Sequence, residues 1–328
     1  MVEARGQGLV LPGRLAALGC DRLSTVMRRL CFLLSLATIG SAQTNPFAGR
    51  WDLTVKASDA TFPSWLEVTG DQVRLVGRVA SVKDGLEVKR DASHLEFSSY
   101  EWFGKRVKVT WALDVHEGKI AGKAKHEDGA EDSVTGVHAP SMKREVKNWS
   151  KPVSLFDGKD LKGWEAFTTE PGKSPENHWI AQNGELVNQA PGANIRTLRK
   201  FTDFKLHIEF NCPNDGNSGI YLRGRDEVQV AYEKSNDAKH GMGSIYGFFA
   251  PSVNLPEKPG EWETFDITLV GRQVTVVRDG VTTIDNQEIP GITGGALDSN
   301  EGAPGPIYIQ GDHTGGMKYR NITISTPQ

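Results

Sequence analysis

The segment at positions 217–230, NSGIYLRGRDEVQV, carries side chains that could bind or transform a polar ligand. It is typical of two short strands joined by a glycine-containing turn, and side chains alternate across a strand. One face of this hairpin therefore carries Tyr221, Arg223, Glu227 and Gln229. A three-residue turn from Gly224 to Asp226 would place Arg223 opposite Glu227 and Tyr221 opposite Gln229. The alternation leaves two interpretations open: the floor of a site, or an exposed surface with a cross-strand ion pair worth about 0.2–1 kcal/mol.

A second group of candidates follows near the end of the chain. The sequence IYIQGDHTGG predicts a strand over Ile307–Gln310, with Tyr308 and Gln310 on one face, and then a tight glycine-rich loop that carries His313. Imidazole exchanges protons near neutral pH and also ligates metals, so His313 is a candidate acid/base or metal ligand. A histidine on a loop is also commonly a plain surface residue, and the spacing alone does not decide between these roles.

The elements that must position these groups are strands throughout. Residues 46–140 alternate between polar and apolar side chains, which predicts antiparallel strands that close into a small barrel, and HEGK at 116–119 is typical of a hairpin turn. The GRW triplet at 49–51 resembles the start of lipocalin-type barrels. Residues 141–152 form a basic linker that ends at a proline. Residues 153–326 carry further strands without helical periodicity or βαβ alternation, which predicts a β-sandwich.

Composition and charge limit the partners. The 328-residue chain has a net charge of −3 and is 38% hydrophobic and 24% charged, which is typical of a soluble globular protein. This charge gives no reason to expect nucleic acid or an anionic membrane surface as a partner. No stretch after residue 42 is long and apolar enough to span a membrane. The oligomeric state is left open.

The first 42 residues are not expected to belong to the fold. MRRLCFLLSLATIGSAQT has a basic start at Met27, an apolar run and small residues up to Ala42, which predicts a signal peptide and export to the periplasm or beyond the cell. Residues 1–26 precede it, and Met27 is the expected true start. Two of the three cysteines precede the predicted cleavage after Ala42, so Cys212 has no partner for an internal disulfide and is predicted to lie in the core.

Six blocks in the second part of the chain occur in one order. They are LFDGKDLKGW at 155–164, NSGIYLRG at 217–224, EVQV at 227–230, GSIYG at 243–247, KPGEW at 258–262 and GPIYIQGDHTGGMKYRNI at 305–322. With these blocks, residues 153–326 resemble the 3-keto-disaccharide hydrolase domain family. The resemblance implies a concanavalin A-like jelly roll in an exported bacterial protein. It also implies an enzyme that cleaves glycosides whose sugar has been oxidised to the 3-ketone.

The resemblance assigns roles to the candidate residues. The polar face of the hairpin becomes the floor of a carbohydrate groove, with Glu227 and His313 as the catalytic groups. The groups expected to contact the sugar are Tyr221, Arg223, Gln229, Tyr246 and Gln310, with Tyr246 as a stacking wall. A carbohydrate, specifically a 3-keto glycoside, is then the expected partner.

The number of carboxylates bears on the reaction. Conventional glycosidases use two, about 5–5.5 Å or 6.5–9.5 Å apart, whereas Glu227 is followed on its own face by Gln229. A C3 ketone acidifies the proton on C2, so one base can remove that proton, the C1 substituent can leave by elimination, and water can add to the product. One base, one enolate stabiliser and one proton donor then suffice.

Other functions remain open on the sequence. The same groove could belong to a non-catalytic carbohydrate-binding module or to a conventional glucanase-type hydrolase, and the first domain could bind a small hydrophobic molecule in its barrel. No cofactor is required by the sequence. A divalent metal ion that holds an enolate is a further option, because no dense cluster of histidines and carboxylates decides the question.

Overall fold

The computed structural model describes residues 45–79, 81–169 and 172–328. Within these ranges the regular elements are β-strands, apart from the 3-10 helix η1 (Ala238–His240), and this confirms the all-β prediction. No helix in the described ranges has the length and apolar character needed to cross a membrane. The predicted signal peptide and the stretch before it lie outside the described residues.

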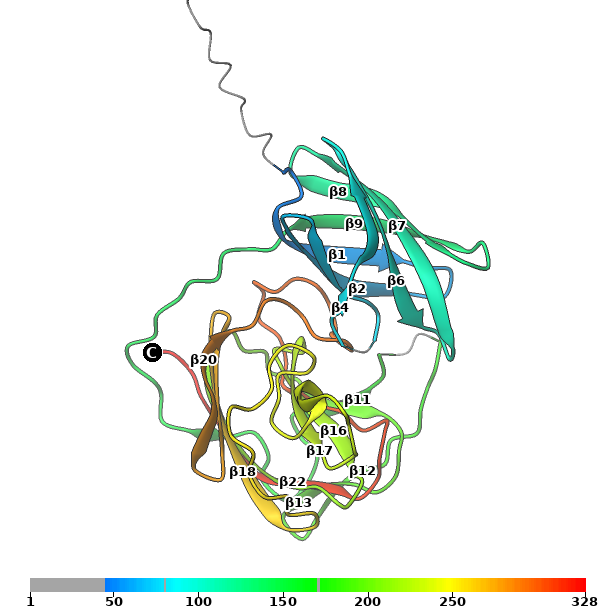
Figure 1. Cartoon of the computed structure of the whole chain (residues 1–328). Helices are drawn as coiled ribbons and strands as arrows, with labels where there is room; N and C mark the ends of the chain where they lie inside the picture. The colour runs from blue at the N-terminus through cyan, green and yellow to red at the C-terminus, as the bar shows by residue number, and fades with distance from the viewer. Residues whose placement is uncertain (1–44, 80, 170–171) are drawn as a thin grey trace, which may run out of the picture. The chain divides into compact units, whose positions relative to one another are not determined.

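The first sheet is an antiparallel meander that curls into a nearly closed barrel, coloured blue to green in Figure 1. Neighbouring strands are consecutive along the chain, except that β1 also pairs with β9. Its strands are β1 (Gly49–Lys56), β2 (Thr61–Thr69), β3 (Gln72–Val76), β4 (Lys83–Asp84), β5 (Leu86–Arg90), β6 (His94–Trp102), β7 (Arg106–His116), β8 (Lys119–His126) and β9 (Glu131–His138).

The alternation of side chains explains these strands. In β7 the inward positions are Val107, Val109, Trp111 and Leu113, all buried. The turn from β7 to β8 has two central residues, Glu117 and Gly118, with φ values of 49° and 71°. Positive φ at both positions gives the type I′ turn that matches the twist of a hairpin. His116 pairs with Lys119 across it, so the hairpin predicted at 116–119 is confirmed.

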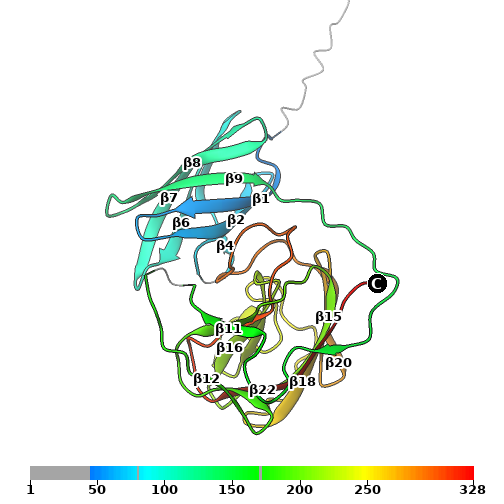
Figure 2. The same cartoon turned by 180° about the vertical axis from the view of Figure 1, so that it is seen from behind.

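The second part of the chain is a jelly-roll sandwich of two antiparallel sheets. The larger sheet contains β10 (Val153–Ser154), β12 (Trp179–Gln182), β13 (Glu185–Asn188), β15 (Phe204–Asn211), β18 (Trp262–Val270), β19 (Gln273–Arg278), β20 (Val281–Glu288) and β22 (Met317–Ser325). The smaller sheet contains β11 (Trp164–Phe167), β14 (Asn194–Thr197), β16 (Asn217–Leu222), β17 (Asp226–Ala231) and β21 (Tyr308–Ile309). Figures 1 and 2 both separate β11 and β16 of the smaller sheet from β18 and β22 of the larger one.

The core of the sandwich lies between these sheets. The smaller sheet contributes the apolar face of the hairpin, whose side chains Ile220, Leu222, Val228 and Val230 are fully buried, as their alternation predicts. Cys212 lies in the same core with a free thiol, and burial raises its pKa to about 12. A thiol with such a pKa stays protonated and unreactive at neutral pH, which agrees with the core role predicted for it.

The hairpin of β16 and β17 differs from the prediction in its register. Tyr221 pairs with Glu227 and Gly219 pairs with Gln229, so the predicted pairing of Arg223 with Glu227 is wrong. The polar face is also not an exposed surface, because Tyr221, Glu227 and Gln229 are each less than 5% exposed. These side chains therefore form a buried floor.

The turn itself accounts for the shift in register. It consists of Arg223, Gly224 and Arg225, and both Arg223 and Gly224 adopt positive φ, 53° and 71°. The backbone N–H of Arg225 donates to the carbonyl of Leu222 at 3.0 Å and closes the turn. Asp226, which the prediction placed in the turn, is the first residue of β17 instead.

Candidate active site

A cavity of about 360 Å³ lies over the polar face of the hairpin. Six residues predicted from the sequence line it: Tyr221, Glu227, Gln229, Tyr246, Gln310 and His313. They come from β16, from β17, from the loop after η1 and from the loop after β21. Segments far apart in the sequence thus bring Glu227 and His313 to one cavity, on one side of the sandwich.

Glu227 is buried at the floor of this cavity, where Thr293 and Tyr221 contact its backbone N–H and its carboxyl group. Its backbone N–H donates to the hydroxyl of Thr293 at 3.0 Å, and its Oε2 lies 2.9 Å from the hydroxyl of Tyr221. Burial raises the pKa of Glu227 to about 8, although the hydrogen bond from Tyr221 and the positive charge of His313 act in the opposite direction. The carboxyl group is therefore mostly protonated at neutral pH.

The hydrogen bonds of Tyr221 agree with a protonated Glu227. The Tyr221 hydroxyl also lies 2.8 Å from the carbonyl oxygen of Gly294, which can only accept. A tyrosine hydroxyl has one hydrogen to donate. If that hydrogen goes to Gly294, the contact with Glu227 is satisfied when the carboxyl group donates to the tyrosine oxygen. The geometry thus accommodates a neutral carboxylic acid.

Two tyrosines hold the loop that borders the cavity. The rings of Tyr221 and Tyr308 stack with their centroids 3.9 Å apart. The Tyr308 hydroxyl donates to the carbonyl of Gly295 at 2.8 Å, one residue beyond the carbonyl that Tyr221 contacts. Gly295 has a φ of 82°, and a Cβ there would lie 2.6 Å from the Tyr221 oxygen. The loop at 294–295 can therefore approach the two tyrosine rings closely only with glycine at position 295, and both hydroxyl groups hold the loop there.

His313 forms the second ionisable group of the cavity. Its Nδ1 lies 2.6 Å from Oδ1 of Asp312, and this hydrogen bond is the main cause that raises the pKa of His313 above its ordinary value. With Nδ1 held by the carboxylate, Nε2 is the nitrogen free to exchange a proton. The side chain is about half exposed, so a ligand can reach it.

Gln229 supplies a polar atom without a partner. Its Oε1 is buried and has no hydrogen-bond partner within the described residues, while the side chain lines the cavity. A buried acceptor left unpaired costs about 1–3 kcal/mol, so such an atom facing a cavity indicates a ligand that donates to it. A sugar hydroxyl is a donor of the required kind.

The segment at 243–249 positions Tyr246 beside β17. The N–H of Gln229 donates to Ser244 and the N–H of Tyr246 donates to Glu227, at 3.0 and 3.1 Å. Val228 also forms an isolated β-bridge with Ile245. The ring of Tyr246 stacks on His240 with centroids 4.7 Å apart, so the imidazole of His240 supports the wall of the cavity.

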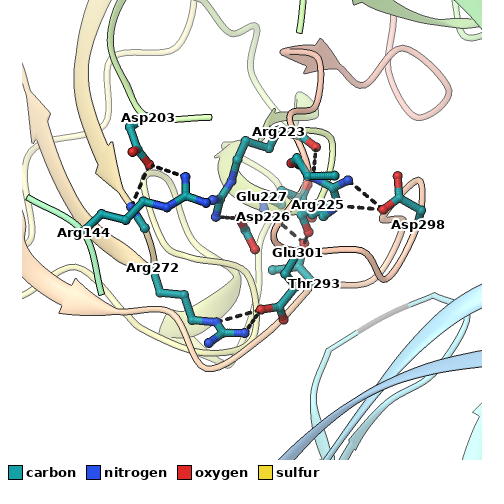
Figure 3. A network of polar contacts seen from close by, with 12 residues as sticks. Arg144, Asp203, Arg223, Arg225, Asp226, Glu227, Arg272, Thr293, Asp298 and Glu301 are labelled. Atoms are coloured by element: carbon teal, nitrogen blue, oxygen red, sulfur yellow. Dashed lines mark hydrogen bonds and ion pairs between the residues drawn. The ribbon is translucent and has the colours of Figure 1, made fainter. Parts of the chain in front are cut away.

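Arg223 does not line the cavity, and the prediction that it faces the site is wrong. Its guanidinium donates to Asp226 at 3.3 Å, and both side chains are buried (Figure 3). Arg225 leaves the same turn and pairs with Asp298 at 2.7 Å. These ion pairs explain the register of the hairpin, because they hold the arginines at the turn and leave Glu227 opposite Tyr221.

Several lining residues were missed by sequence reasoning. They are Asn194, Asn217, Tyr308, Asp312, Val79 and Trp102. Two of them had a local signal, since Tyr308 alternates with Gln310 and Asp312 precedes His313. The asparagines and the two residues from the barrel come from elements whose proximity is decided by tertiary contacts.

The metal question was left open by the sequence. Within the described ranges, no three side chains of His, Cys, Asp or Glu are grouped in a way that could hold a metal ion. The Asp312 carboxylate, which lies closest in sequence to His313, is occupied by the imidazole.

Comparisons with known proteins find relatives that match part of this chain. A curated relative from Bacteroides thetaiotaomicron, named 3-keto-disaccharide hydrolase, is 27% identical over 140 residues, which is 39% of this chain and 47% of the relative. The chain therefore matches about half the length of that relative. A solved protein from Parabacteroides distasonis, provisionally named a glycosyl hydrolase, is 32% identical with a TM-score of 0.44, covering 53% of this chain and 83% of its own. Another from the same organism is 20% identical with a TM-score of 0.44, covering 54% and 94%.

The family profile gives the wider match. It covers residues 151–325, which include both sheets of the sandwich and the hairpin with Glu227, and which make up slightly more than half of the chain. The chain belongs to the family described as the 3-keto-alpha-glucoside-1,2-lyase-like domain.

Proposed function

We propose that this protein is an enzyme that cleaves glycosides whose sugar carries a ketone at C3. The observation that carries the proposal is the pairing of a neutral Glu227 with an Asp312-supported His313 in one cavity. One group is poised to give a proton and the other to take one. Family membership and the name of the curated relative support a hydrolase that acts on carbohydrate.

The proposed reaction begins at the C2 carbon. Nε2 of His313 removes the C2 proton, and the electron pair moves toward the C3 carbonyl to give an enolate. The bond from C1 to the leaving oxygen then breaks, while Glu227 donates its proton to that oxygen. The product is an enone with a double bond between C1 and C2. The raised pKa of Glu227 keeps the proton available at neutral pH.

Water completes the cycle. The Glu227 carboxylate takes a proton from a water molecule, whose hydroxide adds to C1, and the protonated His313 returns a proton to C2. Both side chains then regain their starting states. The unpaired Oε1 of Gln229 accepts a hydroxyl of the sugar and orients the ring over these groups.

The geometry is less suited to conventional glycoside hydrolysis. That reaction needs two carboxyl groups free to act on the glycosidic bond. Among the described lining residues, the carboxyl groups are those of Glu227 and Asp312, and Asp312 is hydrogen-bonded to His313. Elimination from a 3-keto sugar uses the available acid and imidazole base without a second free acid.

The decisive experiment compares substrates and a single-atom change. Purified protein is assayed on 3-keto-trehalose, a methyl 3-keto-glucoside and the unoxidised parents, with and without EDTA. We expect cleavage of the 3-keto compounds alone. Glu227→Gln should lower kcat by about 10²–10⁴-fold and still bind ligand, whereas Glu257→Gln, at an exposed carboxylate outside the cavity, should leave kcat unchanged.

Three other results of these assays would each change the proposed function. Activity on the unoxidised parents would overturn the proposal in favour of a conventional glycosidase. Ligand binding with no turnover of any compound would indicate a binding module. Loss of activity in EDTA, restored by a divalent cation, would add a metal ion to the reaction.

We also propose that the protein is exported, on the basis of the hydrophobic segment that follows Met27. Translation from Met27 should give a mature protein that begins at Gln43 and is found outside the cytoplasm. N-terminal sequencing of the natural product checks this, and an intact N-terminus upstream of residue 27 would contradict it.

A further inference from the structure

The barrel contributes an exposed aromatic side chain to the cavity. Trp102, the last residue of β6, lines the cavity that holds Glu227, and Val79, which lies between β3 and β4, lines it too. Trp102 is 60% exposed, the highest value among the large hydrophobic side chains of the described ranges. The family match begins at residue 151, so Trp102 lies outside the part of the chain that the family profile covers.

The barrel contacts both segments that border the cavity. The carbonyl of Arg78 accepts a hydrogen bond at 3.4 Å from the N–H of Gly295, in the loop that the two tyrosine hydroxyls hold. Trp65 packs edge-on against Phe248 with ring centroids 5.5 Å apart. A Cβ at Gly247 would lie 2.3 Å from the hydroxyl oxygen of Ser81, so the barrel also touches the segment at 243–249 closely.

These contacts involve buried groups. Trp65 is fully buried, and it belongs to the hydrophobic core cluster of the sandwich instead of that of the barrel. Arg272, in the turn just before β19, donates to the carbonyl of Pro140 at 2.7 Å and pairs with the buried carboxylate of Glu301. The barrel that carries Trp102 therefore packs against the sandwich through buried side chains.

Packing within the protein does not explain why position 102 carries a tryptophan. Within the described ranges no aromatic ring stacks on its indole and no cation lies over it, in contrast to Tyr100 on the same strand, which is covered by the guanidinium of Arg106 at 3.9 Å. A large apolar ring left open to solvent loses the free energy that burial would give, about 25 cal/mol per Å². A ligand that covers the ring would recover it.

Burial sets the order of the groups along the cavity. Glu227 is 4% exposed and Trp102 is 60% exposed, so the acid lies at the floor and the indole lies toward solvent. A glycoside bound for cleavage must place its C1–oxygen bond near Glu227. The part of the ligand beyond that oxygen is the part that extends toward Trp102.

We propose that Trp102 is a specificity-determining residue, on which the second sugar ring of a disaccharide stacks while the 3-keto ring occupies the floor. Pyranose rings present faces of C–H bonds, and an indole offers a flat apolar surface with a polar N–H at its edge. The barrel thereby gives the enzyme a preference for disaccharides over glycosides with small aglycones. This inference rests on the proposed function.

The kinetic test separates the two parts of the substrate. Trp102→Ala should raise KM for 3-keto-trehalose about five- to tenfold, with kcat little changed, because one stacking contact is lost. KM for methyl 3-keto-glucoside should stay the same. Trp102→Phe should keep most of the affinity that Trp102→Ala loses. Tyr100→Ala is the control: it removes an exposed aromatic ring from the same strand and should leave KM unchanged. Equal KM values of wild type and Trp102→Ala for 3-keto-trehalose would overturn the inference while the proposed function stood.

A binding experiment keeps the inference testable without turnover. Unoxidised trehalose is titrated calorimetrically into Glu227→Gln and into the double variant with Trp102→Ala. A Kd about five- to tenfold weaker in the double variant supports the stacking role, whether or not the wild-type protein cleaves a 3-keto glycoside. Absence of such cleavage by the wild-type protein would contradict the proposed function but not the stacking role. Equal Kd values, or no binding by either protein, would overturn the stacking role.

Discussion

The carboxyl group of Glu227 lies across Gly219 on the neighbouring strand. A Cβ built at Gly219 would be 2.1 Å from Oε1 of Glu227 and 2.8 Å from its carboxyl carbon. The two residues are diagonal neighbours, because Gly219 pairs with Gln229 and Tyr221 pairs with Glu227. The absence of a side chain at position 219 thus gives the Glu227 carboxyl group the space in which it reaches Tyr221.

Gly219→Ala should displace the acid. No real Cβ tolerates a contact of 2.1 Å, so the carboxyl group must leave the Tyr221 hydroxyl, and we expect kcat/KM to fall by at least about tenfold. Overpacking should lower the free energy of unfolding by about 1–3 kcal/mol. Gly302→Ala is the matched control, since its nearest neighbour would be 3.6 Å away. An alanine variant at 219 with full activity would show that Glu227 need not occupy this position.

The activity should depend on pH with a bell shape. Glu227 must be protonated to act as the acid, so kcat/KM should fall as pH rises through about 8. His313 must be neutral to act as the base, so kcat/KM should also fall as pH decreases through the pKa of His313, which Asp312 raises above its usual range. A pH profile of kcat/KM on 3-keto-trehalose measures both limbs. A rate that keeps increasing beyond pH 9 would exclude Glu227 as the acid.

Tyr221→Phe should move the alkaline limb. When Glu227 is ionised, the Tyr221 hydroxyl donates to its carboxylate and stabilises the charge, which lowers the pKa of Glu227. Removal of this hydroxyl should therefore raise that pKa and shift the fall in kcat/KM to higher pH. Tyr308→Phe removes the hydroxyl of the stacked ring, which bonds to Gly295 and makes no hydrogen bond to Glu227. The position of the limb should therefore be unchanged in Tyr308→Phe. A shift of equal size in both variants would point to the loop at 294–295 instead of the Tyr221–Glu227 contact.

Glu227→Gln should stabilise the fold at alkaline pH. Burial raises the pKa of Glu227 from its ordinary 4.5 to about 8 in the folded protein. Between these values the unfolded chain releases the proton and the folded chain keeps it, so the stability contributed by this residue falls as pH rises. The advantage of the glutamine variant should grow from pH 5 to pH 8, to on the order of a few kcal/mol, and then stay constant. Urea unfolding of both proteins at pH 5, 7 and 9 measures it, and a constant difference would contradict the buried acid.

Local pattern accounts for what could be predicted of the fold. Val107 to Leu113 and Ile220 to Val230 alternate so regularly that each strand and its buried face follow from the sequence, and Glu117 with Gly118 specifies the turn between two of them. The family blocks also led to the prediction that Glu227, Gln310 and His313 share one site, although more than eighty residues separate Glu227 from the other two in the sequence.

The register of the hairpin could not be predicted in the same way. Gly224 fits either of two neighbouring three-residue turns, and the choice depends on where the arginines beside it find partners. Arg225 pairs with Asp298, 73 positions away, and no local pattern reveals such a partner. The position of Trp102 at the cavity could not be predicted for the same reason. It depends on contacts between the barrel and the loops of the sandwich, which no local pattern reveals.

The pairing of the segment at 243–249 with β17 has a consequence for solubility. β17 is the terminal strand of its sheet, and a terminal strand offers unpaired N–H and C=O groups to any passing chain. Backbone bonds from Gly243 to Gln229 and from Tyr246 to Glu227 occupy these groups along the strand that carries the acid. The segment that supports one wall of the cavity thereby also blocks strand addition by a second molecule, and a chain that lost it would expose an edge prone to self-association.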